Sequence, residues 1–222
     1  MGKLIVIEGL DGSGKSTQLE LLLKNLRNSG VDCKSFSFPD YESDSSALVK
    51  MYLKGDFGDK PDSVNPFAAA TFFSVDRYAS YKQNWESYYK NGGNVIVGRY
   101  TTSNAIHQTS KLPPEQWESY LNWLYDFEYN LMGIPKPDLV VMLDMPTEVS
   151  QKLLTGRYNG DESKKDIHER DVAYLENCRK AAVFTAKYSG WEIIDCAEKD
   201  KPRSIESIAQ ELLEKTLNTI SK

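Results

Sequence analysis

The sequence has no long apolar run: its longest such stretches, for example Leu139 to Leu143, cover only a few of the 222 residues. A helix that crosses a membrane needs about 20 consecutive apolar residues. We therefore expect no membrane span and no membrane partner. The first residues, Met1 to Leu4, enter a strand pattern at once. We accordingly expect no signal or transit peptide and a cytoplasmic location.

Cysteine and histidine are also scarce, with three and two residues respectively. The cysteines Cys33, Cys178 and Cys196 form no CxxC pair, so we expect reduced, buried thiols rather than disulfides or a metal site. The only histidines, His107 and His168, are too few for a histidine-based metal centre.

The chain has no excess of positive charge. It contains 27 Lys and Arg residues and 32 Asp and Glu residues, which gives a net charge of −5. General nucleic-acid binding needs a basic face, so no nucleic-acid partner is expected. Hydrophobic residues make up 40% of the chain, which is enough for a core at this length. We expect one domain over residues 1–222.

What the sequence does contain is a regular alternation of strand-like and helix-like segments. The strand patterns are short and nearly continuous in apolar residues, and lie at Leu4–Glu8, Cys33–Phe38, Asn94–Val97, Leu139–Leu143 and Trp191–Ile194. The helical patterns lie at Lys15–Asn28, Ser45–Lys54, Asn65–Tyr89, Pro114–Met132, Thr147–Leu154, Lys165–Lys187 and Ser204–Ile220. This alternation predicts an α/β fold with a five-stranded parallel sheet and helices on both faces.

Residues 155–170 break the alternation. This segment is polar, mixes both charges and carries Gly156 and Gly160. Its position fits an exposed loop and a mobile lid over a nucleotide equally well.

The strongest local signal runs from Gly9 to Ser16 and matches G-x-x-x-x-G-K-[ST] in full. It follows a predicted strand and opens a predicted helix. Its glycines let successive N–H groups point at phosphate oxygens, and the helix N-terminus adds partial positive charge. Lys15 is expected to reach the outer phosphates, and the Ser16 hydroxyl to ligate Mg²⁺. The candidate nucleotide-binding residues are Gly9, Asp11, Gly12, Ser13, Gly14, Lys15, Ser16 and Thr17.

A phosphate-binding loop does not say what happens to the nucleotide. A GTP-hydrolysing switch would need a guanine-reading N-K-x-D after a strand, and the sequence has none. Its only D-x-x-G motif, Asp11 to Gly14, lies inside the phosphate-binding loop. A kinase with a second, acceptor site is therefore favoured.

Two arginines are candidates for that acceptor site. Phe73 and Arg77 lie four residues apart on a predicted helix, so they share a face on which a base can stack and a phosphate be held. Arg99 follows the third predicted strand, at the edge where parallel sheets bind ligands. Each has a plainer alternative: Phe73 in the core, Arg77 at the surface, and Arg99 in a structural ion pair.

The motifs run in one order over nearly the whole chain. They are Glu8 to Thr17, Phe38-Pro39, Phe73 to Arg77, Arg99-Tyr100 with Ser103-Asn104, and Pro137-Asp138 leading into Leu143-Asp144. Together they resemble the thymidylate kinase family, in its bacterial type with no basic residue in the phosphate-binding loop besides the lysine. The resemblance implies a P-loop NTPase fold like that of adenylate kinase, with ATP as donor, dTMP as acceptor, Mg²⁺ and a homodimer.

The resemblance also implies residue roles. Phe73 would stack on thymine, Arg77 would hold the base or the acceptor phosphate, and Asn104 would bind the base edge. Asp11 would contact the deoxyribose and orient Arg99, which would bridge the two phosphates. Other residues with implied roles are Phe38, Ser103 and His107 at the substrate, and Asp166 and Glu169 near the metal and sugar. Arg157, with Lys165 as second choice, would be a lid cation on ATP.

The chain departs from the family pattern in three places. Gly98 replaces an aspartate that helps to hold the metal, and His107 replaces a tyrosine that screens against ribose. No arginine follows Phe38-Pro39 before Arg77. A deoxynucleoside kinase, or another nucleoside-monophosphate kinase, remains the alternative. A nucleoside kinase would need a carboxylate base, and Glu8 could serve.

Overall fold

The computed structural model describes residues 1–157 and 172–221. Its main sheet has five parallel strands in the order β2-β3-β1-β4-β5, which confirms the predicted sheet. The strands are β1 (Leu4–Gly9), β2 (Cys33–Ser37), β3 (Asn94–Gly98), β4 (Leu139–Asp144) and β5 (Glu192–Asp195). β1 lies at the centre, where Ile5 pairs with Ile96 on one side and Leu139 on the other.

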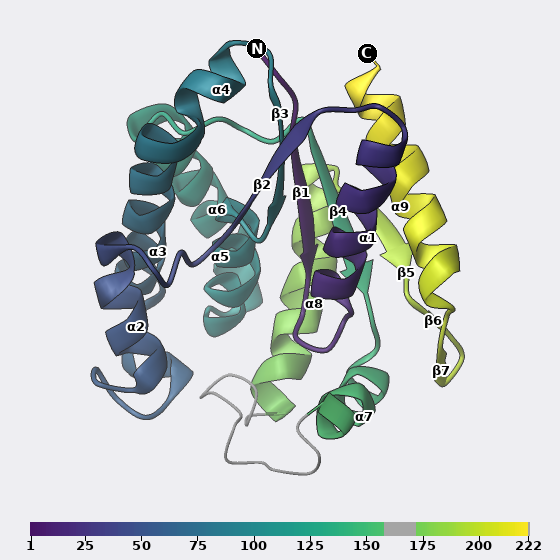
Figure 1. The fold of residues 1–222 in the computed structure, drawn as a ribbon. Helices are drawn as coiled ribbons and strands as arrows, with labels where there is room; N and C mark the ends of the chain where they lie inside the picture. The colour runs from purple at the N-terminus through teal and green to yellow at the C-terminus, as the bar shows by residue number, and fades with distance from the viewer. Residues whose placement is uncertain (158–171, 222) are drawn as a thin grey trace.

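Helices cover both faces of the sheet (Figure 1). They are α1 (Lys15–Asn28), α2 (Ala47–Lys54), α3 (Pro66–Ser80), α4 (Glu86–Lys90), α5 (Thr101–His107), α6 (Trp117–Tyr125), α7 (Thr147–Arg157), α8 (Val172–Ser189) and α9 (Ile205–Ile220). Alternate residues of β1 serve the two faces, as the pleat requires. Ile5 and Ile7 pack in the core with α1 and α9, whereas Leu4 and Val6 pack with the aromatic residues after α3.

Two predicted long helices are interrupted, which corrects the continuous segments Asn65–Tyr89 and Pro114–Met132. The first contains a π-helical stretch at Tyr81–Trp85, and the second ends in another at Asp126–Leu131. A π turn is wider than an α turn and redirects the side chains within it. The first stretch buries Trp85, and the second buries Glu128.

Helix α5 was not predicted, because its sequence TTSNAIH contains poor helix formers and no amphipathic period. All its residues but Ser103 are buried, so packing stabilises it. The small hairpin of β6 (Ala197–Glu198) and β7 (Lys201–Pro202) was also missed. None of the described helices is long and apolar enough to span a bilayer.

Candidate active site

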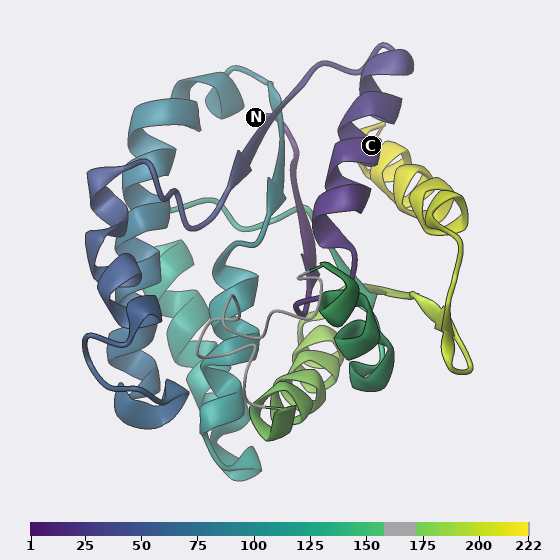
Figure 2. The same ribbon diagram turned by 60° about the horizontal axis from the view of Figure 1, so that its bottom comes forward.

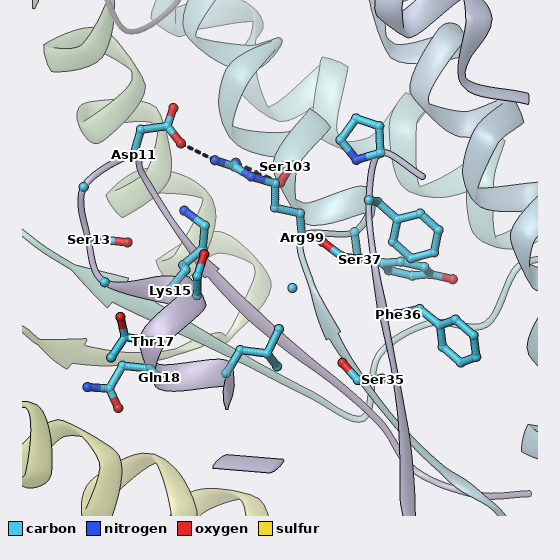
Figure 3. A pocket seen from close by; sticks show the side chains of 18 of the residues that line it. Asp11, Ser13, Lys15, Thr17, Gln18, Ser35, Phe36, Ser37, Arg99 and Ser103 are labelled. Carbon is cyan, nitrogen blue, oxygen red and sulfur yellow. Dashed lines mark hydrogen bonds and ion pairs between the residues drawn. The ribbon is translucent and has the colours of Figure 1, made fainter. Parts of the chain in front are cut away.

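A cavity of about 1300 Å³ opens at the edge of the sheet where β1 and β3 end. Figure 2 turns this edge toward the viewer, and Figure 3 shows part of the lining from close by. Parallel sheets bind ligands at this edge. Among the described side chains, the lining includes every predicted nucleotide-binding residue except Gly9, together with the predicted substrate residues Phe38, Phe73, Arg77, Arg99, Ser103, Asn104 and His107.

The phosphate-binding loop has the backbone that its glycines predict. Gly9 and Gly14 adopt φ values of 153° and 85°. A Cβ atom on Gly9 would lie only 2.9 Å from the carbonyl oxygen of Leu143, so no side chain fits there. The Lys15 ammonium donates to the carbonyl oxygens of Gly9 and Leu10, at 2.6 and 3.0 Å. The lysine is therefore held at the loop, where it can meet the outer phosphates of a nucleotide.

The same loop offers hydroxyl groups to a phosphate and its metal ion. Ser13 Oγ is buried, and it has no hydrogen-bond partner within the described ranges. Such an orphaned hydroxyl suits a loop that donates to phosphate oxygens. Ser16 is exposed at the start of α1. Mg²⁺ usually takes few protein ligands and completes its shell with phosphate and water, so Ser16 fits as a protein ligand.

Arg99 is bound on several sides at the end of β3. Its guanidinium donates to the Asp11 carboxylate and to Ser103 Oγ at 3.5 Å (Figure 3). It also lies 3.8 Å from Glu8. Its backbone has φ 67°, a left-handed conformation uncommon for a residue with a side chain and enriched at functional sites. The structure therefore brings Asp11 and Arg99 together, and Arg99 forms an ion pair while still lining the cavity.

The tautomer of His107 follows from its neighbours. Arginine only donates, so the contact of 3.3 Å from Arg99 to Nε2 makes that nitrogen an acceptor. Nδ1 then carries the proton and faces Cys178 Sγ at 3.6 Å. Burial raises the pKa of the Cys178 thiol to about 11, so it is neutral at physiological pH. His107 is thus a neutral acceptor that helps to orient Arg99.

Glu8 lies beneath this group and is fully buried. One of its carboxylate oxygens accepts hydrogen bonds of 2.7 Å from both Thr102 and Ser103. Within the described part of the chain, Glu8 is not among the residues that line the cavity. It is therefore badly placed to serve as a base for an acceptor hydroxyl.

Arg77 is buried rather than at the surface, with an exposed fraction of 2%. Its Nε and Nη2 atoms donate to the two carboxylate oxygens of Glu128, at 2.8 and 2.5 Å. Burial opposes the charge of Arg77, but the attraction and hydrogen bonds of Glu128 outweigh it and raise the pKa of the guanidinium. The bidentate contact therefore places the Glu128 carboxylate directly against the charge of the guanidinium.

Asn104 presents one amide atom to the cavity. Its Nδ2 donates to the Ala70 carbonyl oxygen at 3.0 Å and to Glu128 at 3.2 Å. Both partners only accept, so the carbonyl oxygen Oδ1 is the atom left for a ligand. Nearby, the half-buried Phe73 lines the cavity and meets the Tyr52 ring edge-on, with 6.1 Å between ring centroids.

The chain is similar to known proteins in sequence and in fold. A sequence profile of the thymidylate kinase family matches residues 7–208. The thymidylate kinase of Mycobacterium tuberculosis is 32% identical, over 85% of this chain and 87% of its own length. The chain belongs to the thymidylate kinase family. A probable thymidylate kinase of Saccharolobus solfataricus is 30% identical, over 100% of this chain and 98% of its own.

The fold is that of a thymidylate kinase as well. The structure of the Candida albicans thymidylate kinase matches with a TM-score of 0.72 and 24% identity, over 98% of this chain and 93% of that one. Residues Lys165 to Glu169 and the Arg157 side chain lie outside the described residues. Sequence reasoning missed Glu128, since a lone glutamate in an aromatic helix gives no signal. It also missed Arg203, which lines the cavity beside the unpredicted hairpin.

Proposed function

We propose that the chain is a dTMP kinase, which transfers the γ-phosphoryl group of ATP to the phosphate of dTMP and releases dTDP and ADP. Family membership supports this activity. The observation that carries it is the shared cavity: the phosphate-binding loop, Arg77 and Asn104 all line it. Arg99 joins the two sides, because it contacts Asp11 in the loop and His107 in α5.

Positioning and charge neutralisation account for most of the rate enhancement in such a transfer. Lys15 holds the donor phosphates, and Arg99, oriented by Asp11 and His107, neutralises charge between donor and acceptor. Ser16 would hold Mg²⁺ together with phosphate oxygens, and the bound ion would screen the developing charge. The acceptor phosphate is already anionic, so no strong general base is needed. Lys15 is the only basic residue of the loop, which supports assignment to the bacterial type.

Arg77 and Asn104 suit the thymine base rather than the acceptor phosphate. Glu128 compensates the charge of Arg77, so little net charge is left for an anion. The Arg77 Nη1 donor has no partner within the part of the chain that the structure describes, and Asn104 Oδ1 is an acceptor. This pattern complements the O4 carbonyl and the N3–H of thymine. Phe73 supplies a face for stacking.

A panel of nucleosides and nucleoside monophosphates, each with ATP and Mg²⁺, tests the proposal through ADP release. We expect dTMP to have the highest kcat/KM, dUMP to be accepted less well and dCMP to react poorly. The buried position of Glu8 speaks against the alternative of a deoxynucleoside kinase. Faster ADP release with thymidine than with dTMP would nevertheless establish that alternative.

We also propose a homodimer in the cytoplasm. Apolar side chains of α2 and α3 remain exposed, namely Leu48, Met51, Val75 and Tyr78. Val75 and Tyr78 lie three apart, on one face of α3. A grouped apolar surface of this kind suits a second copy of the chain. The three cysteines are free thiols, which suits a reducing compartment.

A further inference from the structure

Glu128 lies at the meeting point of three elements, although it belongs to none of the motifs above. Its side chain has no exposed area. One carboxylate oxygen accepts from Ser74 at 2.8 Å, from Arg77 Nη2 at 2.5 Å and from Asn104 at 3.2 Å. The other accepts from Arg77 Nε at 2.8 Å and from Thr101 at 2.7 Å. The carboxylate therefore binds donors from α3 and α5 while it sits in the π-helical stretch after α6.

We propose that Glu128 is a positioning residue for the acceptor base, and that it fixes which atoms of Arg77 and Asn104 face the cavity. The proposal rests on dTMP being the acceptor. Glu128 is not among the described residues that line the cavity, so it acts through the two residues that are.

The amide of Asn104 cannot turn over within this network. Its Nδ2 meets two groups that only accept, the carboxylate and the Ala70 carbonyl. A rotation by 180° would bring Oδ1 against both of them and leave the buried Nδ2 without either partner. The acceptor Oδ1 is thereby held outward, as the N3–H of thymine requires. Cytosine carries no hydrogen at N3 and would meet this oxygen with a lone pair.

Arg77 is fixed by the same carboxylate. Glu128 engages the Nε and Nη2 edge of the guanidinium in a bidentate pair, which sets the plane of the group. The direction of the Nη1 donor is then set by the pair with Glu128 and not by the ligand. A donor beside an acceptor matches the 4-oxo and N3–H edge of thymine and mismatches the 4-amino edge of cytosine.

The local backbone supports a dedicated role for Glu128. The stretch Asp126–Leu131 is π-helical, and Glu128 is its only fully buried residue. π turns of this kind are costly in a regular helix and occur frequently at functional sites. Here the wider turn brings the Glu128 carboxylate into contact with Arg77 and Asn104, which line the cavity. A regular continuation of α6 would not need to make these contacts.

The test compares Glu128→Gln with Thr101→Val, steady-state kinetics being measured with dTMP and with dCMP. Thr101→Val removes one hydrogen bond to the carboxylate, whereas Glu128→Gln removes its charge and one of its two acceptor oxygens. Thr101 touches no base-reading group in this network. For Glu128→Gln we expect the dTMP KM to rise about 10- to 100-fold, as for loss of a hydrogen bond to a charged group. The kcat at saturating dTMP and the ATP KM should stay within about threefold. The dTMP-to-dCMP ratio of kcat/KM should fall at least tenfold, and Thr101→Val should keep it.

An unchanged ratio in a folded Glu128→Gln variant would overturn the proposal, as would an equal fall in Thr101→Val. If Glu128→Gln does not fold, Glu128→Asp takes its place, because it keeps the charge but is too short to hold Arg77 and Asn104 together. Binding to the wild-type protein, measured by calorimetry, provides an independent test. N3-methyl-dTMP should bind at least about tenfold more weakly than dTMP, and equal binding would contradict the outward acceptor.

Failure of the wild-type protein to phosphorylate dTMP would instead refute the proposed function. Normal dTMP turnover by the wild type, with the same dTMP-to-dCMP ratio in Glu128→Gln, would refute the positioning role alone.

Discussion

At the scale of single residues, substitution of Phe73 distinguishes a role in base stacking from a role in core packing. Phe73→Ala should raise the dTMP KM about 5- to 150-fold, because stacking of a base on an aromatic ring contributes roughly 1–3 kcal/mol. The ATP KM should hardly change. The neighbouring Phe72 provides the control: it packs on Phe57 and is not among the described residues that line the cavity. If Phe72→Ala shifts both constants as Phe73→Ala does, Phe73 serves only packing.

Gly98 is the second residue at which a substitution has a predictable effect on folding and activity. A Cβ atom there would lie 3.0 Å from the Cδ2 atom of Leu19, the mobile end of a side chain, and Gly98 lines the cavity. Gly98→Asp should therefore fold with a small shift of Leu19 and keep kcat within about threefold, since positioning of the phosphates is unchanged. Gly98→Ala controls for the added Cβ alone. A folded but inactive Gly98→Asp, beside an active Gly98→Ala, would mean that this chain arranges its metal ion differently.

At the scale of elements, the strands and the phosphate-binding loop follow from local pattern. β1 is buried throughout and apolar except for Glu8, and the glycines after it adopt the conformations that only glycine favours. Helix α5 and the π-helical stretches depend instead on distant partners. Glu128, for example, receives four donor side chains from α3 and α5, and no spacing in the sequence reveals these contacts. Such elements follow from tertiary packing, which overrides propensity.

Lys111 links the short 3₁₀ helix after α5 to α2 and should give the stability of the protein a distinct pH dependence. Its ammonium donates to Tyr52 Oη at 2.9 Å and to the Val64 carbonyl at 3.3 Å. Burial lowers the pKa of Lys111 to about 8, whereas in an unfolded chain it is about 10.4. Between these values the unfolded chain binds more protons, so the folded state gains stability as pH rises.

Urea unfolding of the wild type and Lys111→Met between pH 7.5 and 10.5 measures this effect. The stability of the wild type relative to the variant should rise by roughly 1–3 kcal/mol over that range. Comparison with the variant removes the contributions of other titrating groups. Parallel stability curves would show that Lys111 keeps its ordinary pKa.

At the scale of the whole molecule, the exposed apolar face of α2 and α3 is the proposed dimer surface. Val75, on this face of α3, is 45% exposed. Val75→Arg should bring an unpartnered charge into the interface and lower the dimer affinity by at least about tenfold. Light scattering behind a sizing column measures the mass across a concentration series. Tyr188→Arg on α8, where Tyr188 is 40% exposed, should leave the mass unchanged. A monomeric wild type, or equal effects of both variants, would contradict this surface.

The shared carboxylate of Glu128 also limits how the enzyme can evolve. Four side chains from two helices donate to it, so a change in any one of them removes a buried hydrogen bond. A single substitution in this network that moves base preference from thymine toward cytosine is therefore expected to lower the free energy of unfolding as well. The acceptor preference of this chain is accordingly tied to the stability of its fold.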